Sequence, residues 1–169
     1  MQKLYIDCDG VILDTINKSY QMLKEANITT ESEVSKFYNS IDWNNLIEIS
    51  GQINDSINKI KELTKYFDVE ILTHVYSEHE ANAKKEYFDK VLKGINVIAV
   101  PKTIKKADFV NPTGCILVDD YSSNLMYWEE KGGISVKFSD HEENCPYAVI
   151  SDLLELIELY VKNKIKVKE

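Results

Sequence analysis

The chain has 169 residues, of which 44% are hydrophobic, so it suits a single domain with its own core and room for a small insertion. Its formal net charge of −8 repels polyanions and argues against nucleic acid polymers or anionic lipid as partners, although a local lysine cluster can still bind a small phosphorylated ligand. The N-terminal residues lack a secretion leader, and no apolar stretch approaches the roughly 20 residues that span a bilayer. We therefore expect a cytoplasmic protein without a membrane partner.

Apolar segments of strand length alternate with segments of helical periodicity along the chain. Five segments rich in Val, Ile and Leu are predicted as strands: residues 3–9, 69–73, 95–100, 114–120 and 133–138. They lack the polar alternation of a sheet with one wet face, which is typical of parallel strands covered on both sides. The pattern predicts an α/β fold in three layers, with a doubly wound parallel sheet between helices.

The residues after the first predicted strand interrupt this alternation. Residues 16–53 have helical spacing and no convincing strand, and they are too many for a connection between a strand and a helix. We interpret them as a small helical cap. The core domain is then predicted to comprise residues 1–15 and 54–169.

Three later helices are predicted from their end signals. Ser77 and Glu80 have the spacing of a capping box, and Gly94 supplies a stop. A second helix is expected over residues 122–131, where it meets two glycines. A third is expected from Ser151, and the basic end of the chain, residues 161–169, is interpreted as its solvated last turns.

The three cysteines, Cys8, Cys115 and Cys145, are an odd number without metal-like spacing, which predicts reduced thiols. Cys8 lies between two aspartates, whose charges would raise the pKa of its thiol. It is therefore a poor candidate for a nucleophile.

Polar residues end four of the predicted strands, and such ends meet at one edge of a parallel sheet, where ligands bind. The first strand ends in two acids one residue apart, the second in a threonine and a histidine, the third in a lysine and the fourth in two acids: Asp7, Asp9, Thr73, His74, Lys102, Asp119 and Asp120. Two unit charges about 4 Å apart repel by about 4 kcal/mol at an effective dielectric near 20, so four carboxylates need a cation. Hard oxygen ligands beside a phosphate suit Mg²⁺. Each residue alone would more often form a turn, and the combination carries the prediction.

In this order the motifs resemble those of the haloacid dehalogenase-like (HAD) superfamily of phosphotransferases. The matching text is "DCDGVILDT" from Asp7, "ILT" ending at Thr73, Lys102, and "ILVDD" ending at Asp120. Within the superfamily the chain is most similar to the 5'(3')-deoxyribonucleotidase-like phosphatases, through "DxDGVxxD", the short helical insertion and "KTIKKADF" at residues 102–109. The resemblance covers most of the predicted core.

The resemblance implies a Mg²⁺-dependent phosphomonoester hydrolase that forms an aspartyl-phosphate. Asp7 would be the nucleophile and Asp9 the general acid and base, Thr73 would hold a phosphate oxygen, and Lys102 would neutralise nucleophile and phosphate. The implied metal ligands are Asp7, the backbone carbonyl of Asp9, Asp119 and, through water or by orienting the others, Asp120. Proton transfer by Asp9 asks for a pKa raised by its neighbours.

The choice of lysine has an alternative. The stretch "VNPT", residues 110–113, looks like an insertion before the last acid pair, so Lys105 is a substitute for Lys102. Lys84 and Lys85 belong to a predicted helix and are interpreted as solvated.

The predicted cap carries the aromatic residues Tyr20, Phe37, Tyr38 and Trp43, which could stack on a base. The resemblance to the nucleotidases makes a nucleoside monophosphate the expected substrate, which His74 could also contact, although aromatics in a small helical unit usually pack its own core. Two alternatives remain. One is a sugar phosphatase or phosphomutase on the same scaffold, and the other is a non-enzymatic phosphoacceptor domain of the receiver type, whose motif order places the lysine last.

Overall fold

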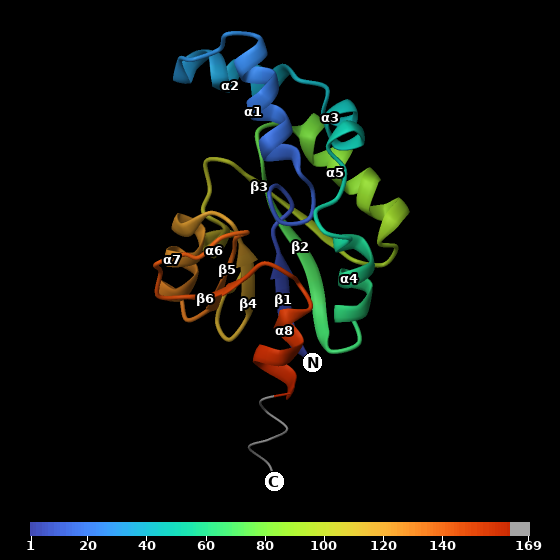
Figure 1. Ribbon diagram of the computed structural model, residues 1–169, viewed down its shortest axis with the longest axis vertical. Coiled ribbons are helices and arrows are strands. Elements are labelled where there is room, and N and C mark those ends of the chain that lie inside the picture. Colours follow the sequence, from blue (N-terminus) through green and yellow to red (C-terminus); the bar gives the residue numbers. More distant parts are fainter. Residues whose placement is uncertain (163–169) are drawn as a thin grey trace.

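A six-stranded, fully parallel sheet runs through the molecule, seen in a computed structural model that describes residues 1–162 (Figure 1). The strands lie in the order β3-β2-β1-β4-β5-β6. Their bounds are β1 Gln2–Ile6, β2 Phe67–Val75, β3 Val97–Pro101, β4 Ile116–Asp119, β5 Ile134–Phe138 and β6 Ala148–Ile150. The order reverses between β1 and β4, so the carboxyl ends of these two strands form the switch point of a doubly wound sheet. The predicted fold class is confirmed, and the short β6 is an addition to the five predicted strands.

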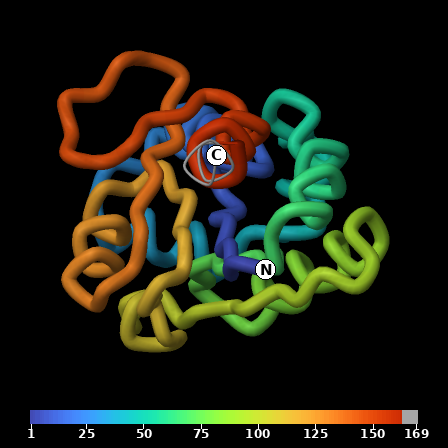
Figure 2. The backbone as a smooth tube through the Cα atoms, turned by 90° about the horizontal axis from the view of Figure 1, so that it is seen from below, coloured from blue at the N-terminus to red at the C-terminus, as the bar shows by residue number. Residues whose placement is uncertain are grey.

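Side chains of the central strands alternate between two apolar cores, one on each face of the sheet. Leu4 and Ile6 of β1 pack in the larger core, while Tyr5 points into the smaller one against Trp128. Helices therefore cover both faces, as continuous apolar strands require. Their bounds are α4 Ser56–Leu63, α5 Glu78–Val91 and α8 Glu155–Ile157 on the larger core, and α6 Lys106–Phe109 and α7 Ser122–Glu130 on the smaller one. Figure 2 shows α8 and α6 on opposite sides of β1.

The helix ends agree with the sequence in part. The Ser77 hydroxyl accepts from the Glu80 N–H, but the Glu80 carboxylate accepts from the Tyr76 N–H, so α5 has only half of the predicted capping box. α7 ends one residue before its predicted end. The last helix begins at Glu155 and not at Ser151, because the Glu155 carboxylate accepts N–H groups from the turn before it. It continues as a π-helix, Glu158–Lys162, and the rest of the predicted basic end, residues 163–169, lies outside the described residues.

Three helices lie between β1 and α4: α1 Thr15–Glu25, α2 Glu31–Ser40 and α3 Trp43–Ser50. Figure 1 shows them beyond the carboxyl end of the sheet, with α3 beside α5. The chain leaves and rejoins the core at one place, since the Ile53 N–H donates to the Ile12 carbonyl at 2.8 Å. The helical content of the insertion is as predicted, and its action as a cap stays a prediction.

None of the helices within residues 1–162 is long and apolar enough to cross a membrane. The three cysteines are free, as predicted, and Cys8 is fully buried. Burial, followed by the charge of Asp9, raises the pKa of the Cys8 thiol well above its usual value, which agrees with a structural role.

Candidate functional site

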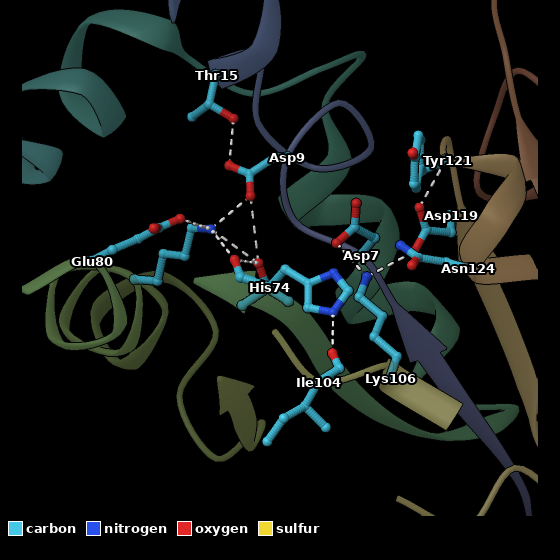
Figure 3. A network of polar contacts seen from close by, with 12 residues as sticks. Asp7, Asp9, Thr15, His74, Glu80, Ile104, Lys106, Asp119, Tyr121 and Asn124 are labelled. Carbon is cyan, nitrogen blue, oxygen red and sulfur yellow. Dashed lines mark hydrogen bonds and ion pairs between the residues drawn. The ribbon is translucent and has the colours of Figure 1, made fainter. Parts of the chain in front are cut away.

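Asp7, Asp119 and Lys106 form a buried ion cluster at the carboxyl ends of β1 and β4 (Figure 3). Asp7 is held in line with β1 because its N–H donates to the Val118 carbonyl at 2.9 Å. The Lys106 ammonium lies 2.7 Å from Asp7 Oδ1 and 2.7 Å from Asp119 Oδ2. Burial and then the charge of Asp119 raise the pKa of Asp7, while Lys106 partly opposes them. One lysine is thus shared by two carboxylates.

The structure places Lys106 beside Asp7, where the sequence predicted Lys102. Lys102 is exposed, and its ammonium lies 5.7 Å from the ring centre of Tyr76 and 5.9 Å from that of Tyr121, at the edge of the pocket described below. The substitute candidate Lys105 is also exposed and lies over the ring of Tyr127. The reason is local: α6 begins at Lys106, so the first helical residue points inward together with Ala107.

The second acid pair completes an oxygen-rich corner. Asp119 accepts a hydrogen bond from the Tyr121 N–H and another from Asn124 Nδ2, both at 2.9 Å. Burial and then the charge of Asp119 raise the pKa of Asp120 to about 7. Asp7, Asp119 and Asp120 each offer a carboxylate oxygen within 4.8 Å of the others, so these three residues could hold a metal ion. Three hard oxygen donors with one lysine beside them suit Mg²⁺ better than a metal that prefers sulfur or imidazole.

Gly10 shapes the loop that follows β1. Its φ of +80° lies in the region that only glycine adopts readily, and an added Cβ would stand 2.3 Å from Asp120 Oδ2. The glycine therefore allows the chain both to turn and to pass close to the acid pair of β4.

Asp9 belongs to a second, separate ion cluster. Its Oδ1 accepts from the Thr15 hydroxyl at 2.6 Å and its Oδ2 from the Lys84 ammonium at 2.6 Å. Lys84 is fully buried and also bonds Glu80 at 2.7 Å, so the prediction of a solvated lysine is wrong, whereas Lys85 is exposed as predicted. Burial alone would raise the pKa of Asp9, but Lys84 and the Thr15 hydroxyl outweigh it and lower that pKa. The expected raised pKa is therefore absent in the free protein.

Thr73 and His74, both predicted to contact the substrate, lie near the end of β2. Thr73 is fully buried, and its hydroxyl accepts from Lys84 at 3.0 Å and lies 3.5 Å from Asp9 Oδ2, so it is engaged inside the second cluster. His74 lines the pocket, and its Nε2 lies 2.8 Å from the Ile104 carbonyl. Burial lowers the pKa of His74 to about 4, so the ring is neutral and its Nε2–H is donated to Ile104. His74 can offer a ligand only the unprotonated Nδ1.

A pocket of about 400 Å³ lies above the acids. It is bounded by Asp7, Asp9, Lys106 and the last acid pair below, and by residues of the inserted helices above. Tyr20 lines it and is 60% exposed, whereas Trp43 lines it from an almost buried position. Phe37 is not among the lining residues and packs against Tyr38 instead, so the structure does not bring it to the site.

Lys106, Lys84, Glu80 and Thr15 are the site residues that the sequence reading missed. Two features of the amino-acid sequence pointed to the lysines and Glu80. Glu80 and Lys84 stand four apart on one helix, the spacing of an ion pair, and Lys106 directly precedes "ADF". Neither signal says that the pair is buried, because burial depends on what packs over the helix.

The sequence matches no protein-family profile and no curated protein sequence. Solved hydrolase structures nevertheless resemble the chain. The HAD-hydrolase YfnB of Bacillus subtilis, bound to magnesium, has 14% identity and a TM-score of 0.63 over 95% of this chain and 98% of that one. A subfamily IA, variant 1 HAD-superfamily hydrolase of Geobacter sulfurreducens has 16% identity and a TM-score of 0.63 over 94% and 96%. D,D-heptose 1,7-bisphosphate phosphatase of B. bronchiseptica, complexed with magnesium and phosphate, has 12% identity and a TM-score of 0.56 over 96% and 99%.

Identities this low establish likeness of the backbone, and the closer resemblance to nucleotidases stays a prediction. Each of the three alignments covers at least 94% of this chain. The chain has the fold of the HAD-superfamily hydrolases.

Proposed function

We propose that the protein is a Mg²⁺-dependent phosphomonoester hydrolase that works through an aspartyl-phosphate on Asp7. The observation that carries the proposal is the position of Asp7: a nearly buried carboxylate at the switch point, beside Lys106 and two further acids, and open to the pocket. Burying a carboxylate at this depth is costly unless positive charge surrounds it. A site of this kind suits an anionic substrate brought in together with a divalent cation.

The chain's own residues account for both halves of the reaction. A carboxylate oxygen of Asp7 attacks phosphorus while the bond to the substrate oxygen breaks, and Asp9 gives that leaving oxygen a proton. Water then attacks phosphorus and gives a proton to Asp9, while the bond between the Asp7 oxygen and phosphorus breaks, which frees phosphate and the Asp7 carboxylate. Lys106 holds positive charge beside Asp7 throughout. Bound Mg²⁺, held by Asp7, Asp119 and Asp120, would supply further neutralisation of the phosphate charge.

Asp9 must be protonated when the leaving oxygen departs, although its pKa is lowered in the free protein. A bound phosphate brings negative charge next to Asp9, and a like charge favours the protonated carboxyl. Substrate binding therefore shifts Asp9 toward the state that the first step needs.

The aromatic lining of the pocket supports a nucleoside monophosphate as substrate. Tyr20, Tyr76 and Tyr121 line the pocket, and the ammonium of Lys102 lies near the faces of the latter two rings. Stacking of a base on an aromatic side chain is worth about 1–3 kcal/mol. Trp43 is less suited to stacking on a base, because its ring covers Lys84 at 4.9 Å.

We also propose that the protein is located in the cytoplasm.

A sugar phosphate is the second candidate. The similarity to a heptose bisphosphate phosphatase favours it, and phosphomutase activity on the same scaffold remains an alternative to hydrolysis. A receiver-type phosphoacceptor is disfavoured, since such domains have the strand order 2-1-3-4-5, unlike the order found here.

The test is release of inorganic phosphate from a panel of nucleoside monophosphates and sugar phosphates with Mg²⁺ present. We expect turnover of at least one nucleoside monophosphate, loss of turnover in EDTA, and none in Asp7→Asn. Turnover restricted to sugar phosphates would replace the first candidate by the second. Unchanged turnover in Asp7→Asn would remove Asp7 as the nucleophile.

The acid cluster also predicts how stability depends on pH. Without metal, Asp120 has a pKa of about 7 in the folded protein, well above that of an unfolded aspartate, and the pKa of Asp7 is raised too. The folded state then binds more protons than the unfolded state, so stability falls as pH rises from about 5 to about 8. The lowered pKa of Asp9 affects stability only at pH values below this range.

We therefore expect the Tm in EDTA to decrease across that pH range, followed by circular dichroism, and saturating Mg²⁺ to remove most of the decrease. Asp120→Asn should flatten the profile in EDTA. A Tm that is constant or rises with pH in EDTA would contradict the prediction.

A further inference from the structure

The buried ions around Lys84 are a part of the site that the two reaction steps do not use. Lys84 and Glu80 lie one turn apart on α5, and both are at most 1% exposed. Moving each ion out of water costs several kcal/mol, so a buried ion cluster contributes little to stability on balance. Such a cluster needs another explanation, and its contact with Asp9 suggests one.

Both oxygens of the Asp9 carboxylate are held, each from a different side. Thr15, the first residue of α1, donates to Oδ1 at 2.6 Å (Figure 3). Lys84 donates to Oδ2, also at 2.6 Å. Two short hydrogen bonds to the two oxygens fix the rotation of the carboxylate plane. The Asp9 side chain still lines the pocket and is 21% exposed, so this orientation is the one a substrate meets.

Lys84 is itself fixed from several directions. Besides Glu80 and Asp9, its ammonium bonds the Thr73 hydroxyl at 3.0 Å and the His74 carbonyl at 3.1 Å. The other Glu80 oxygen accepts from the Tyr76 N–H at 2.6 Å, which ties the pair to the end of β2. Through these bonds, Lys84 links the Asp9 carboxylate to the end of β2 and so fixes its position relative to the sheet.

The inserted helices close this arrangement. The ring of Trp43, the first residue of α3, lies 4.9 Å from the Lys84 ammonium, and its indole N–H donates to the Tyr38 carbonyl at 3.2 Å. Thr15 opens α1 of the same insertion. The orientation of Asp9 thus depends on residues of the core and of the insertion together.

We propose that Lys84, held by Glu80 and covered by Trp43, is a positioning residue that fixes the Asp9 carboxylate for proton transfer to the leaving oxygen. The inference rests on the proposed function and deepens it. It assigns the buried pair to the first chemical step and not to substrate binding.

A dependence on the leaving group follows. An alkyl phosphate releases a strongly basic oxygen that needs the proton from Asp9, whereas 4-nitrophenolate is a good leaving group without it. The value of kcat/KM covers the steps up to departure of the leaving group. A misplaced Asp9 should therefore lower kcat/KM for an alkyl phosphate far more than for 4-nitrophenyl phosphate.

The main variant is the double substitution Lys84→Met with Glu80→Gln. Lys84→Met alone leaves two buried carboxylates without their cation and risks unfolding, whereas the double variant also removes the Glu80 charge. Lys85→Met, at the exposed neighbouring position of α5, is the matched control. We expect the double variant to lose about 10- to 100-fold in kcat/KM on the best alkyl phosphate and less than about threefold on 4-nitrophenyl phosphate. The control should be unchanged on both.

A crystal structure of the double variant gives a readout that does not need activity. We expect the Asp9 carboxylate to rotate away from its orientation toward the pocket. An unrotated Asp9 would overturn the inference whatever the activity, and so would equal losses on the two substrates. A wild-type protein that releases phosphate from no monoester would instead refute the proposed function, and the orientation of Asp9 would still decide the positioning role.

Discussion

Lys106→Met is expected to reduce phosphate release by about a hundred- to a thousandfold, because it removes the only described ammonium that contacts Asp7. Methionine matches the lysine side chain as far as Cε and lacks the charged ammonium. The variant also leaves Asp7 and Asp119 buried without their cation, which should lower the free energy of unfolding in EDTA by about 3–5 kcal/mol. Urea unfolding, followed with and without Mg²⁺, measures this second effect, and Mg²⁺ should recover part of it.

Two further lysine variants make the result specific. Lys102→Met should retain kcat and raise KM, since Lys102 lies at the pocket edge and away from Asp7. Lys105→Met, whose side chain covers Tyr127 outside the pocket, should behave as wild type. If Lys102→Met instead abolished kcat while Lys106→Met did not, the lysine chosen from the spacing of the sequence motif would be the right one after all.

The fold was predictable because its main signals are local and strong. Apolar runs such as Leu4–Ile6 and Ile116–Val118 show neither polar alternation nor the length of a membrane helix, so only a sheet buried on both faces accommodates them. Once these two runs are taken as neighbouring parallel strands, the acids that follow them, Asp7 and Asp119, are expected to meet at the switch point. The strand β6 was missed because three residues carry too little pattern. The late start of the last helix depends on Glu155 reaching back to two N–H groups, which no periodicity records.

The site was predictable where a residue's place follows from its strand, and not where it follows from a helix. Asp7, Asp119 and Asp120 are placed by β1 and β4, and the structure brings them together as predicted. The choice among Lys102, Lys105 and Lys106 depends on where a one-turn helix begins. Lys84 was interpreted as solvated together with its helix, and the helix spacing does not show that Trp43, far away in the sequence, lies over its ammonium. Contacts between helices and strands determine which lysines lie beside the carboxylates, and the spacing of residues in the sequence does not show these contacts directly.

Gly10→Ala is expected to lower Mg²⁺ affinity by about 10- to 100-fold and turnover with it, because its Cβ would stand 2.3 Å from Asp120 Oδ2. The clash is with a carboxylate that the ion would need, so the acid must turn out of the site or the loop must move away from it. The positive φ of Gly10 adds a backbone strain of about 1–3 kcal/mol. Isothermal titration of Mg²⁺ measures the affinity, and phosphate release measures turnover.

Gly51→Ala separates the two causes. Gly51 has a similar φ of +73°, but an added Cβ there meets nothing within 4 Å, so this variant carries the backbone strain without the clash. Gly10→Ala should lose more stability than Gly51→Ala in EDTA, because it adds the clash to the strain, and only Gly10→Ala should lose Mg²⁺ affinity. An equal loss of affinity in the two would mean that backbone strain alone loosens the acid cluster. Retained affinity in Gly10→Ala would mean that Asp120 is not needed for the ion, leaving Asp7 and Asp119, which share Lys106, as its carboxylate ligands.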